Sequence, residues 1–365
     1  MQEDLQQYIK VKQLTHKLLL QFIESDLNVE ENFENFLASE NNLSFTDDIY
    51  ELKSLLTLIA KVANNHAKST NFFWKVFKIL DCLKVHMKQN FSNNEIFDLF
   101  KSNKRILLYL IESDILNIDD NILNILTNGK YKKRKYQEYL NLLVETSKQT
   151  DSIDFKKKQF EGENDLYICK LIRNDMIDEF IVYIKKMNFP LVSLIKTSIF
   201  ETNPFLLKHE PTLLEYCAFF GSIQIFKYLK RNKVPLTSSI WEYAIHGNNQ
   251  ELLNILIKNK IVPKDKTYRS CLEESIKCHH INITNYIIEH LIDNYEEICN
   301  QNNKFNKNIH YYSFRYHNYM FLPTDFQNKF LFFYSCQFNY YALVNFYLSS
   351  KVVNKKEKII LYFIF

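Results

Sequence analysis

Glycine is scarce in this chain of 365 residues, which contains four glycines where average usage would give roughly 25. Phosphate-binding and dinucleotide-binding loops need several glycines close together, and neither a G-x-G-x-x-G nor a G-x-x-x-x-G-K-[ST] motif is present. The nucleophile elbow G-x-S-x-G is missing for the same reason. The sequence therefore excludes the common nucleotide-binding motifs and gives no sign of a serine-hydrolase site.

Proline is missing from the first 189 residues, because all six prolines lie at or after Pro190. Apolar residues in this stretch recur at helical spacing, as in Leu52, Leu55, Leu56 and Ile59. Few turn signals interrupt them. We expect about eight helices joined by short polar loops before residue 150.

Paired cysteines are also lacking: the seven cysteines are scattered, odd in number and include no C-x-x-C. They are typical of reduced core thiols in an intracellular protein. The polar, acidic N-terminus predicts no secretion signal. The longest uncharged apolar run, Ile359–Phe365, is too short to span a bilayer. We expect a cytoplasmic protein, and the basic run Lys130–Lys135 leaves nuclear import as an alternative.

Two of the four glycines occupy matching places in a repeated pattern. The segments Thr212–Gly221 and Ser238–Gly247 share the order hydroxyl, apolar pair, small residue, glycine. An apolar helical run follows each, and then a Val-Pro step, Val234-Pro235 or Val262-Pro263. Because glycine adopts positive φ at almost no cost, each glycine predicts a sharp turn between two helices.

Further units extend this pattern along the second half of the chain. Tyr183–Leu191 matches Tyr228–Leu236 at an offset of 45, and a weak unit is expected at His310–Asn318. A period near 30 with two short helices per unit indicates the ankyrin class of repeat. The predicted turn residues are Asn174, Gly221, Gly247, Cys278 and Phe338.

The segment Thr212–Ser222 resembles the ankyrin motif T-P-L-H-x-A-A-x-x-G-H, since it keeps the Thr, the second Leu, the Ala and the Gly. The region from Ser198 to His280, together with Asn94–Phe97 and Phe100–Ile106, looks like a large protist family. Its members join an uncharacterised N-terminal helical region to divergent ankyrin repeats. The resemblance implies a binding scaffold and brings no catalytic role.

We predict an all-α protein with a helical N-terminal domain followed by an irregular ankyrin-like α-solenoid. The expected divisions are a domain of unknown function over 1–150, a linker over 151–165, divergent repeats over 166–352 and a basic, apolar tail over 353–365. The tail is interpreted as the cut end of a longer array, as a segment docked on the last repeat, or as a peripheral membrane anchor.

The predicted function is reversible binding of a protein partner, of unknown identity, through the concave face of the repeats. We expect no catalysis, no cofactor and no small-molecule substrate, and we expect neither nucleic acid nor membrane as a partner. One alternative is an enzymatic N-terminal domain with the repeats as a targeting arm. Another is an adaptor of the membrane skeleton.

Residues just before each turn line the concave face of an ankyrin stack, and exposed aromatics beside charges suit protein binding. The predicted contact residues are Tyr216, Phe219, Phe220, Trp241, Glu242, Ile245, His246, Glu273, Ile276 and Lys277. The alternative for Phe219 and Phe220 is simple packing between repeats.

A metal site at Cys278, His246 and either His279 or His280 is a further candidate. Zinc needs four converging ligands, usually at short spacing, and the sequence offers no such set. We therefore predict no metal.

Overall fold

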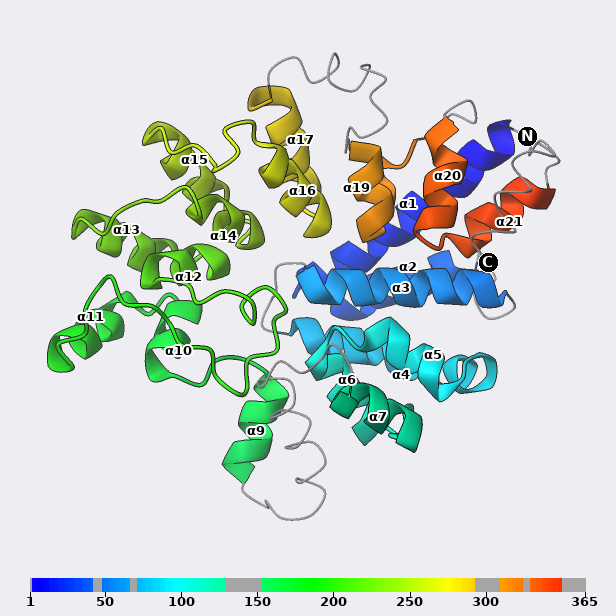
Figure 1. The fold of residues 1–365 in the computed structure, drawn as a ribbon, viewed down its shortest axis with the longest axis horizontal. Coiled ribbons are helices and arrows are strands. Elements are labelled where there is room, and N and C mark those ends of the chain that lie inside the picture. The colour runs from blue at the N-terminus through cyan, green and yellow to red at the C-terminus, as the bar shows by residue number, and fades with distance from the viewer. Residues whose placement is uncertain are drawn as a thin grey trace. The chain divides into compact units, whose positions relative to one another are not determined.

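The structure is a computed structural model that describes residues 2–41, 48–65, 71–128, 153–292, 309–323 and 329–349. These residues contain 19 α-helices, one 3₁₀ helix and no strand, which confirms the all-α prediction (Figure 1). No helix within these ranges has the length and apolar character needed to cross a membrane.

The helices fall on both sides of the gap that follows residue 128. Before it lie α1 (Gln2–Glu24), α2 (Val29–Asn41), α3 (Ile49–Asn65), α4 (Phe72–Asn90), α5 (Asn93–Phe100), α6 (Lys104–Glu112) and α7 (Asp120–Asn128). After it lie α9 (Ile153–Glu161), α10 (Tyr167–Arg173), α11 (Ile177–Lys186), α12 (Leu213–Phe220), α13 (Ile223–Arg231), α14 (Ile240–His246), α15 (Gln250–Lys258), α16 (Arg269–Lys277), α17 (Ile281–His290), α19 (Ile309–Tyr316), η1 (Tyr319–Phe321), α20 (Lys329–Gln337) and α21 (Tyr341–Ser349).

The chain divides into two compact units, but not at the predicted boundary. Unit 1 contains residues 1–63, 68–80 and 275–365, and unit 2 contains residues 64–67 and 81–274. The C-terminal helices α19–α21 therefore belong with α1–α3. The predicted linker over 151–165 contains the helix α9. The basic run Lys130–Lys135 and the tail 353–365 lie outside the described residues.

In unit 1, side chains of α1 and α3 hold the C-terminal helices. The buried Tyr319 hydroxyl lies 2.6 Å from Ser54 Oγ on α3, and Gln13 on α1 donates to the Tyr319 carbonyl at 3.2 Å. The ring of Tyr8 stacks on Phe346 of α21 with 5.7 Å between centroids. Because these contacts join residues about 300 positions apart, no local sequence pattern could have revealed them.

Two buried lysines of unit 1 find acceptors inside the unit. Lys12 is paired with Glu51, which also accepts a hydrogen bond from the Tyr8 hydroxyl at 3.1 Å. Lys75 is fully buried and donates to the Ser25 carbonyl at 2.7 Å, just beyond the C-terminus of α1. An ammonium group at this place satisfies carbonyls that the helix cannot pair and opposes the negative end of its dipole.

Unit 2 contains three successive helix pairs, α10/α11, α12/α13 and α14/α15. The first helices contact one another in order, since α12 packs against both α10 and α14, and α11 packs against α13 (Figure 1). Thr212 and Glu215 form a capping box at the start of α12. Glu215 also accepts a hydrogen bond from Ser239 Oγ at 2.5 Å, which ties the beginning of α12 to the beginning of α14.

The turn after each first helix contains one residue of positive φ. At the second pair this is Gly221, with φ of 70°, as predicted. At the other turns, the residue with positive φ follows the predicted residue by one position. Asn174 and Gly247, for example, have negative φ values of −95° and −69°. The positive-φ residues that follow the four other predicted turns are Asp175, Asn248, His279 and Asn339. Asn174, Gly247, Cys278 and Phe338 therefore lie in the turns, as predicted, but the left-handed residue of each turn is the next one.

The residue after the positive-φ position links consecutive helix pairs. In unit 2, Ser222 Oγ donates to the Ile172 carbonyl at 2.5 Å. In unit 1, Asn318 Nδ2 donates to the Ile276 carbonyl at 2.9 Å. Each acceptor stands three positions before the positive-φ residue of the preceding turn. The same bond, at the same offset, thus recurs in two separate parts of the chain.

Gly247 is needed for space and not for its φ value. A Cβ atom at this position would overlap the carbonyl oxygen of Ala218, in the last turn of α12. The turn after α14 therefore approaches the end of α12 more closely than any side chain would permit. Gly221 differs, since its φ of 70° is itself unfavourable for L residues.

We expect Gly247→Asn to lower the free energy of unfolding by about 3 kcal/mol, because an overpacked site must move backbone to relieve the overlap. Gly221→Asn should cost about 1 kcal/mol, because Asn tolerates the left-handed region. Urea unfolding followed by circular dichroism measures both. Equal losses in the two variants would contradict the difference between the two glycines.

Candidate functional site

The structure buries most of the predicted contact residues. Those with at most 8% of their surface exposed are Tyr216, Phe219, Trp241, Ile245, His246 and Ile276. Those that are half-exposed are Phe220, Glu242, Glu273 and Lys277. Because a buried side chain cannot touch a partner in the folded protein, the first set is removed from the predicted binding face.

Phe205 explains why Phe219 and His246 are buried. It lies in the connection between α11 and α12, and its ring stacks on Phe219 at 5.7 Å and lies against His246 at 4.3 Å. Tyr243 meets the same ring edge-on at 5.0 Å. Sequence reasoning missed Phe205, since an irregular segment has no periodicity. Its one local signal is the preceding Asn203-Pro204 step, which is typical of a turn.

Trp241 anchors the connection between α15 and α16. Its indole N–H donates to the Ile261 carbonyl at 2.9 Å, and its ring meets Tyr268 edge-on at 5.3 Å. A buried tryptophan with a satisfied N–H stabilises the fold. It offers nothing to a binding partner.

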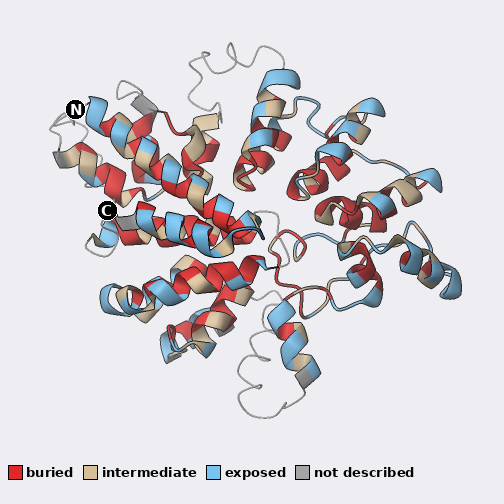
Figure 2. Cartoon of the chain, turned by 180° about the vertical axis from the view of Figure 1, so that it is seen from behind, coloured by how far each residue is buried: buried red, intermediate tan, exposed pale blue. Residues whose placement is uncertain are grey.

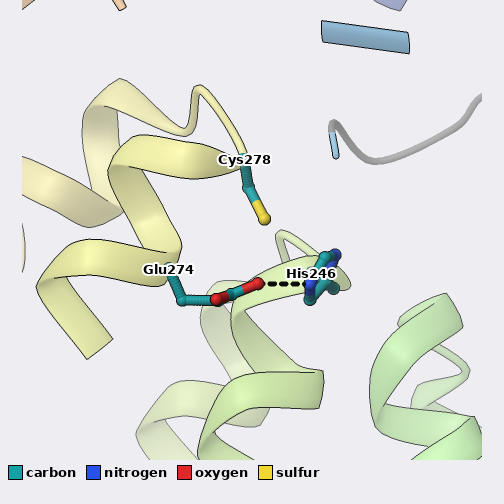
Figure 3. A group of neighbouring side chains, drawn as sticks. All are labelled: His246, Glu274 and Cys278. Atoms are coloured by element: carbon teal, nitrogen blue, oxygen red, sulfur yellow. Dashed lines mark hydrogen bonds and ion pairs between the residues drawn. The ribbon is translucent and has the colours of Figure 1, made fainter. Parts of the chain in front are cut away.

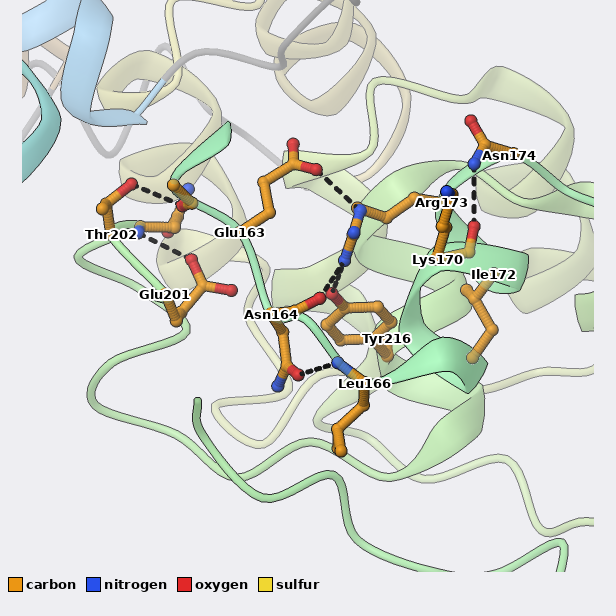
Figure 4. Close-up of polar contacts among 12 residues, drawn as sticks. Glu163, Asn164, Leu166, Lys170, Ile172, Arg173, Asn174, Glu201, Thr202 and Tyr216 are labelled. Atoms are coloured by element: carbon orange, nitrogen blue, oxygen red, sulfur yellow. Dashed lines mark hydrogen bonds and ion pairs between the residues drawn. The ribbon is translucent and has the colours of Figure 1, made fainter. Parts of the chain in front are cut away.

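Tyr216 belongs to a buried polar cluster centred on Arg173 (Figure 4). The Arg173 guanidinium donates to the Tyr216 hydroxyl at 3.2 Å and to the Asn164 carbonyl at 2.7 Å, and it pairs with Glu163 at 2.7 Å. Burial raises the pKa of Tyr216 well above its ordinary value, so the phenol is neutral at physiological pH. The cluster connects α10 and α12 to the segment before α10.

The thiol of Cys169 lies beside this cluster. Burial raises the pKa of Cys169 to about 12, and burial also raises the pKa of Cys336, to about 11. Since the thiolate is the reactive form, both groups are poor nucleophiles at neutral pH. Cys82 differs from the expectation of core thiols, because it is exposed.

His246 has a carboxylate partner. Its Nε2 lies 2.7 Å from Glu274 Oε1, both within unit 2 (Figure 3). Cys278, drawn in the same figure, belongs to unit 1, because the division between the units falls inside α16. Of the metal ligands considered from the sequence, His246 therefore lies in unit 2, and Cys278, His279 and His280 lie in unit 1.

Protein-family models, curated proteins and solved structures give no match to this chain. The function is therefore inferred from the side chains that the fold exposes. In unit 2 these include three residues of the predicted face, Phe220, Glu242 and Glu273.

We expect Phe205→Ala to lower the free energy of unfolding by about 3–5 kcal/mol, because it leaves a cavity over Phe219 and His246. His209 contacts the same ring at 4.7 Å but is exposed. His209→Ala is therefore the matched control and should cost less than about 1 kcal/mol. Urea unfolding midpoints compare the two. Similar losses would show that Phe205 does not cover the face of α12 and α14.

Among the described cysteines, Cys82 should react first with a thiol reagent at neutral pH. The buried thiols should react only after unfolding, because the reagent cannot reach them. Burial also raises the pKa of Cys169, Cys217, Cys271 and Cys336, which lowers the fraction of reactive thiolate. Mass spectrometry of peptides after brief labelling measures the order. Early labelling of Cys169 or Cys217 would contradict the burial of these groups.

Proposed function

We propose that the helix pairs of unit 2 form an irregular ankyrin-like array, and that the protein uses this array to bind a partner protein reversibly without catalysing a reaction. The supporting observation is the recurring turn, in which a positive-φ residue is followed by a side chain that bonds to the preceding helix pair. Repeats that stack through their turns give a rigid surface, as in solenoid proteins.

The proposed binding surface is the half-exposed remainder of the predicted face in unit 2, namely Phe220, Glu242 and Glu273. These residues belong to the successive first helices α12, α14 and α16. An apolar ring beside carboxylates suits a partner that presents an apolar side chain close to lysine or arginine.

Phe220 is suited to act as the apolar anchor because its neighbours hold it in place. Its ring contacts Tyr216 at 4.7 Å and Phe219 at 5.0 Å. Tyr216 is in turn fixed by the guanidinium of Arg173. A side chain that is ordered before binding loses little conformational entropy on association, so more of its contact energy remains as affinity.

We expect the double variant Phe220→Ser, Glu242→Lys to weaken partner binding by at least about tenfold, because a central aromatic anchor typically contributes more than about 1.4 kcal/mol. The partner would be identified by proximity labelling in the native cell, and its affinity for purified wild-type and variant chains measured by calorimetry. Helicity should be unchanged, since neither side chain is buried.

Asn254→Ala is the matched control, because Asn254 is exposed on α15, away from the proposed surface. It should leave both the partner and its affinity unchanged. An unaltered affinity in the double variant would refute the assignment of the binding surface. A purified chain that converts a substrate would refute the non-catalytic role.

A further inference from the structure

The helix α11 exposes apolar side chains to solvent. Val182 is 65% exposed and Met187, just after the helix, is 57% exposed. Tyr183 lies beside them and is half-exposed, with its ring 5.3 Å from that of Tyr167, which is itself 54% exposed. Much of α11 is accordingly coloured as exposed in Figure 2. These side chains place apolar surface where a binding partner can cover it.

The charges on α11 are arranged symmetrically about Val182. Asp178 and Glu179 lie in the first turn, and Lys185 and Lys186 lie in the last turn. All four are exposed. They stand four and three positions before Val182 and three and four positions after it, so they lie on the same face of the helix. Along this face of α11, the acidic residues come first, the apolar Val182 follows, and the basic residues come last.

The helix dipole alone accounts for the signs of these charges but not for the apolar centre. Acidic residues favour the start of any helix and basic residues favour its end. The helix α15 shows this order too, with Glu251 in its first turn and Lys258 in its last. However, the exposed residue between them is the polar Asn254. The exposed valine at the centre distinguishes α11 from α15.

We propose that α11 pairs in antiparallel orientation with α11 of a second copy of this chain, around a two-fold axis at Val182. The rotation brings each valine onto the partner's Val182. It also places Asp178 opposite the partner's Lys186 and Glu179 opposite the partner's Lys185. Each copy contributes the same two pairs, so the contact contains four opposite-charge pairs around an apolar centre.

The order of the charges on α11 favours a second copy of this chain as the partner of this helix. A two-fold contact requires a surface that is complementary to itself, and α11 meets this requirement because its charges have opposite signs at equal distances from Val182. An unrelated partner would impose no such symmetry. The helix of ten residues is about 15 Å long, so the contact is small and the dimer is weak, with a dissociation constant of about 10 to 100 µM.

This inference goes beyond the proposed function, because it concerns the outer face of a second helix and a different partner. The first test is sedimentation velocity of the full chain over a series of concentrations. Wild type should pass from monomer to dimer as its concentration rises. Val182→Asn places an asparagine at the centre of α11, where α15 has Asn254. This variant should weaken the dimer by about tenfold or more. A wild-type chain that stays monomeric up to about 1 mM, well above the expected constant, overturns the proposal.

Charge reversal provides the second test. Asp178→Lys and Lys186→Glu should each weaken self-association, because like charges then face each other across the axis. An equimolar mixture of the two variants should restore the dimer, since the two substituted positions then face each other with opposite signs. Lys258→Glu on α15 is the matched control and should leave the dimer unchanged. Circular dichroism of each variant checks that the helices remain folded.

The mixture of the two charge-reversal variants tests the orientation of the helices. Recovery of the dimer supports the antiparallel arrangement, because this geometry sets position 178 of one copy opposite position 186 of the other. A dimer that neither Val182→Asn nor the charge reversals weaken overturns the proposal, since its interface would then lie elsewhere. These tests require no bound partner protein, so their failure leaves the binding function at Phe220 and Glu242 to be judged by its own experiment.

Discussion

The close approach of successive helix pairs at their turns is the constraint on which the structure of unit 2 depends. The turn after α14 comes so near the end of α12 that only glycine fits at position 247. At the neighbouring turn, the Ser222 hydroxyl donates to the carbonyl of Ile172. These contacts set the spacing between the first helices. The close approach explains the glycine at position 247, whereas Gly221 is explained by its φ of 70°.

That spacing decides which side chains are available for function. The helix α12 packs against both α10 and α14, so it is almost entirely buried and its Tyr216 serves as an internal anchor. The buried aromatic residues Tyr216, Phe219 and Trp241 on these helices stabilise the fold. The residue proposed as the binding anchor, Phe220, lies at the end of α12, and the proposed self-association uses the second helix α11.

Local patterns in the sequence were enough to predict helices and turns. The match between Tyr183–Leu191 and Tyr228–Leu236 corresponds to a real structural equivalence, because Asn188 and Lys233, 45 positions apart, both have positive φ. The left-handed residue was predicted correctly at Gly221 and lies one residue later at the other four turns, since the end of a helix is set by which carbonyl the capping N–H reaches. Packing between distant segments was not predictable. Helical periodicity shows that a face is apolar, but not that Tyr8 meets Phe346.

The buried reactive groups and the exposed apolar side chains of unit 2 have different surroundings. Cys169 is buried and protonated, and the Arg173 guanidinium is already occupied by Glu163, Asn164 and Tyr216. Groups engaged in this way hold neighbouring segments of unit 2 together. Phe220 and Val182, in contrast, are accessible apolar side chains on firmly packed helices. In the two proposals above, association with another protein covers these apolar side chains.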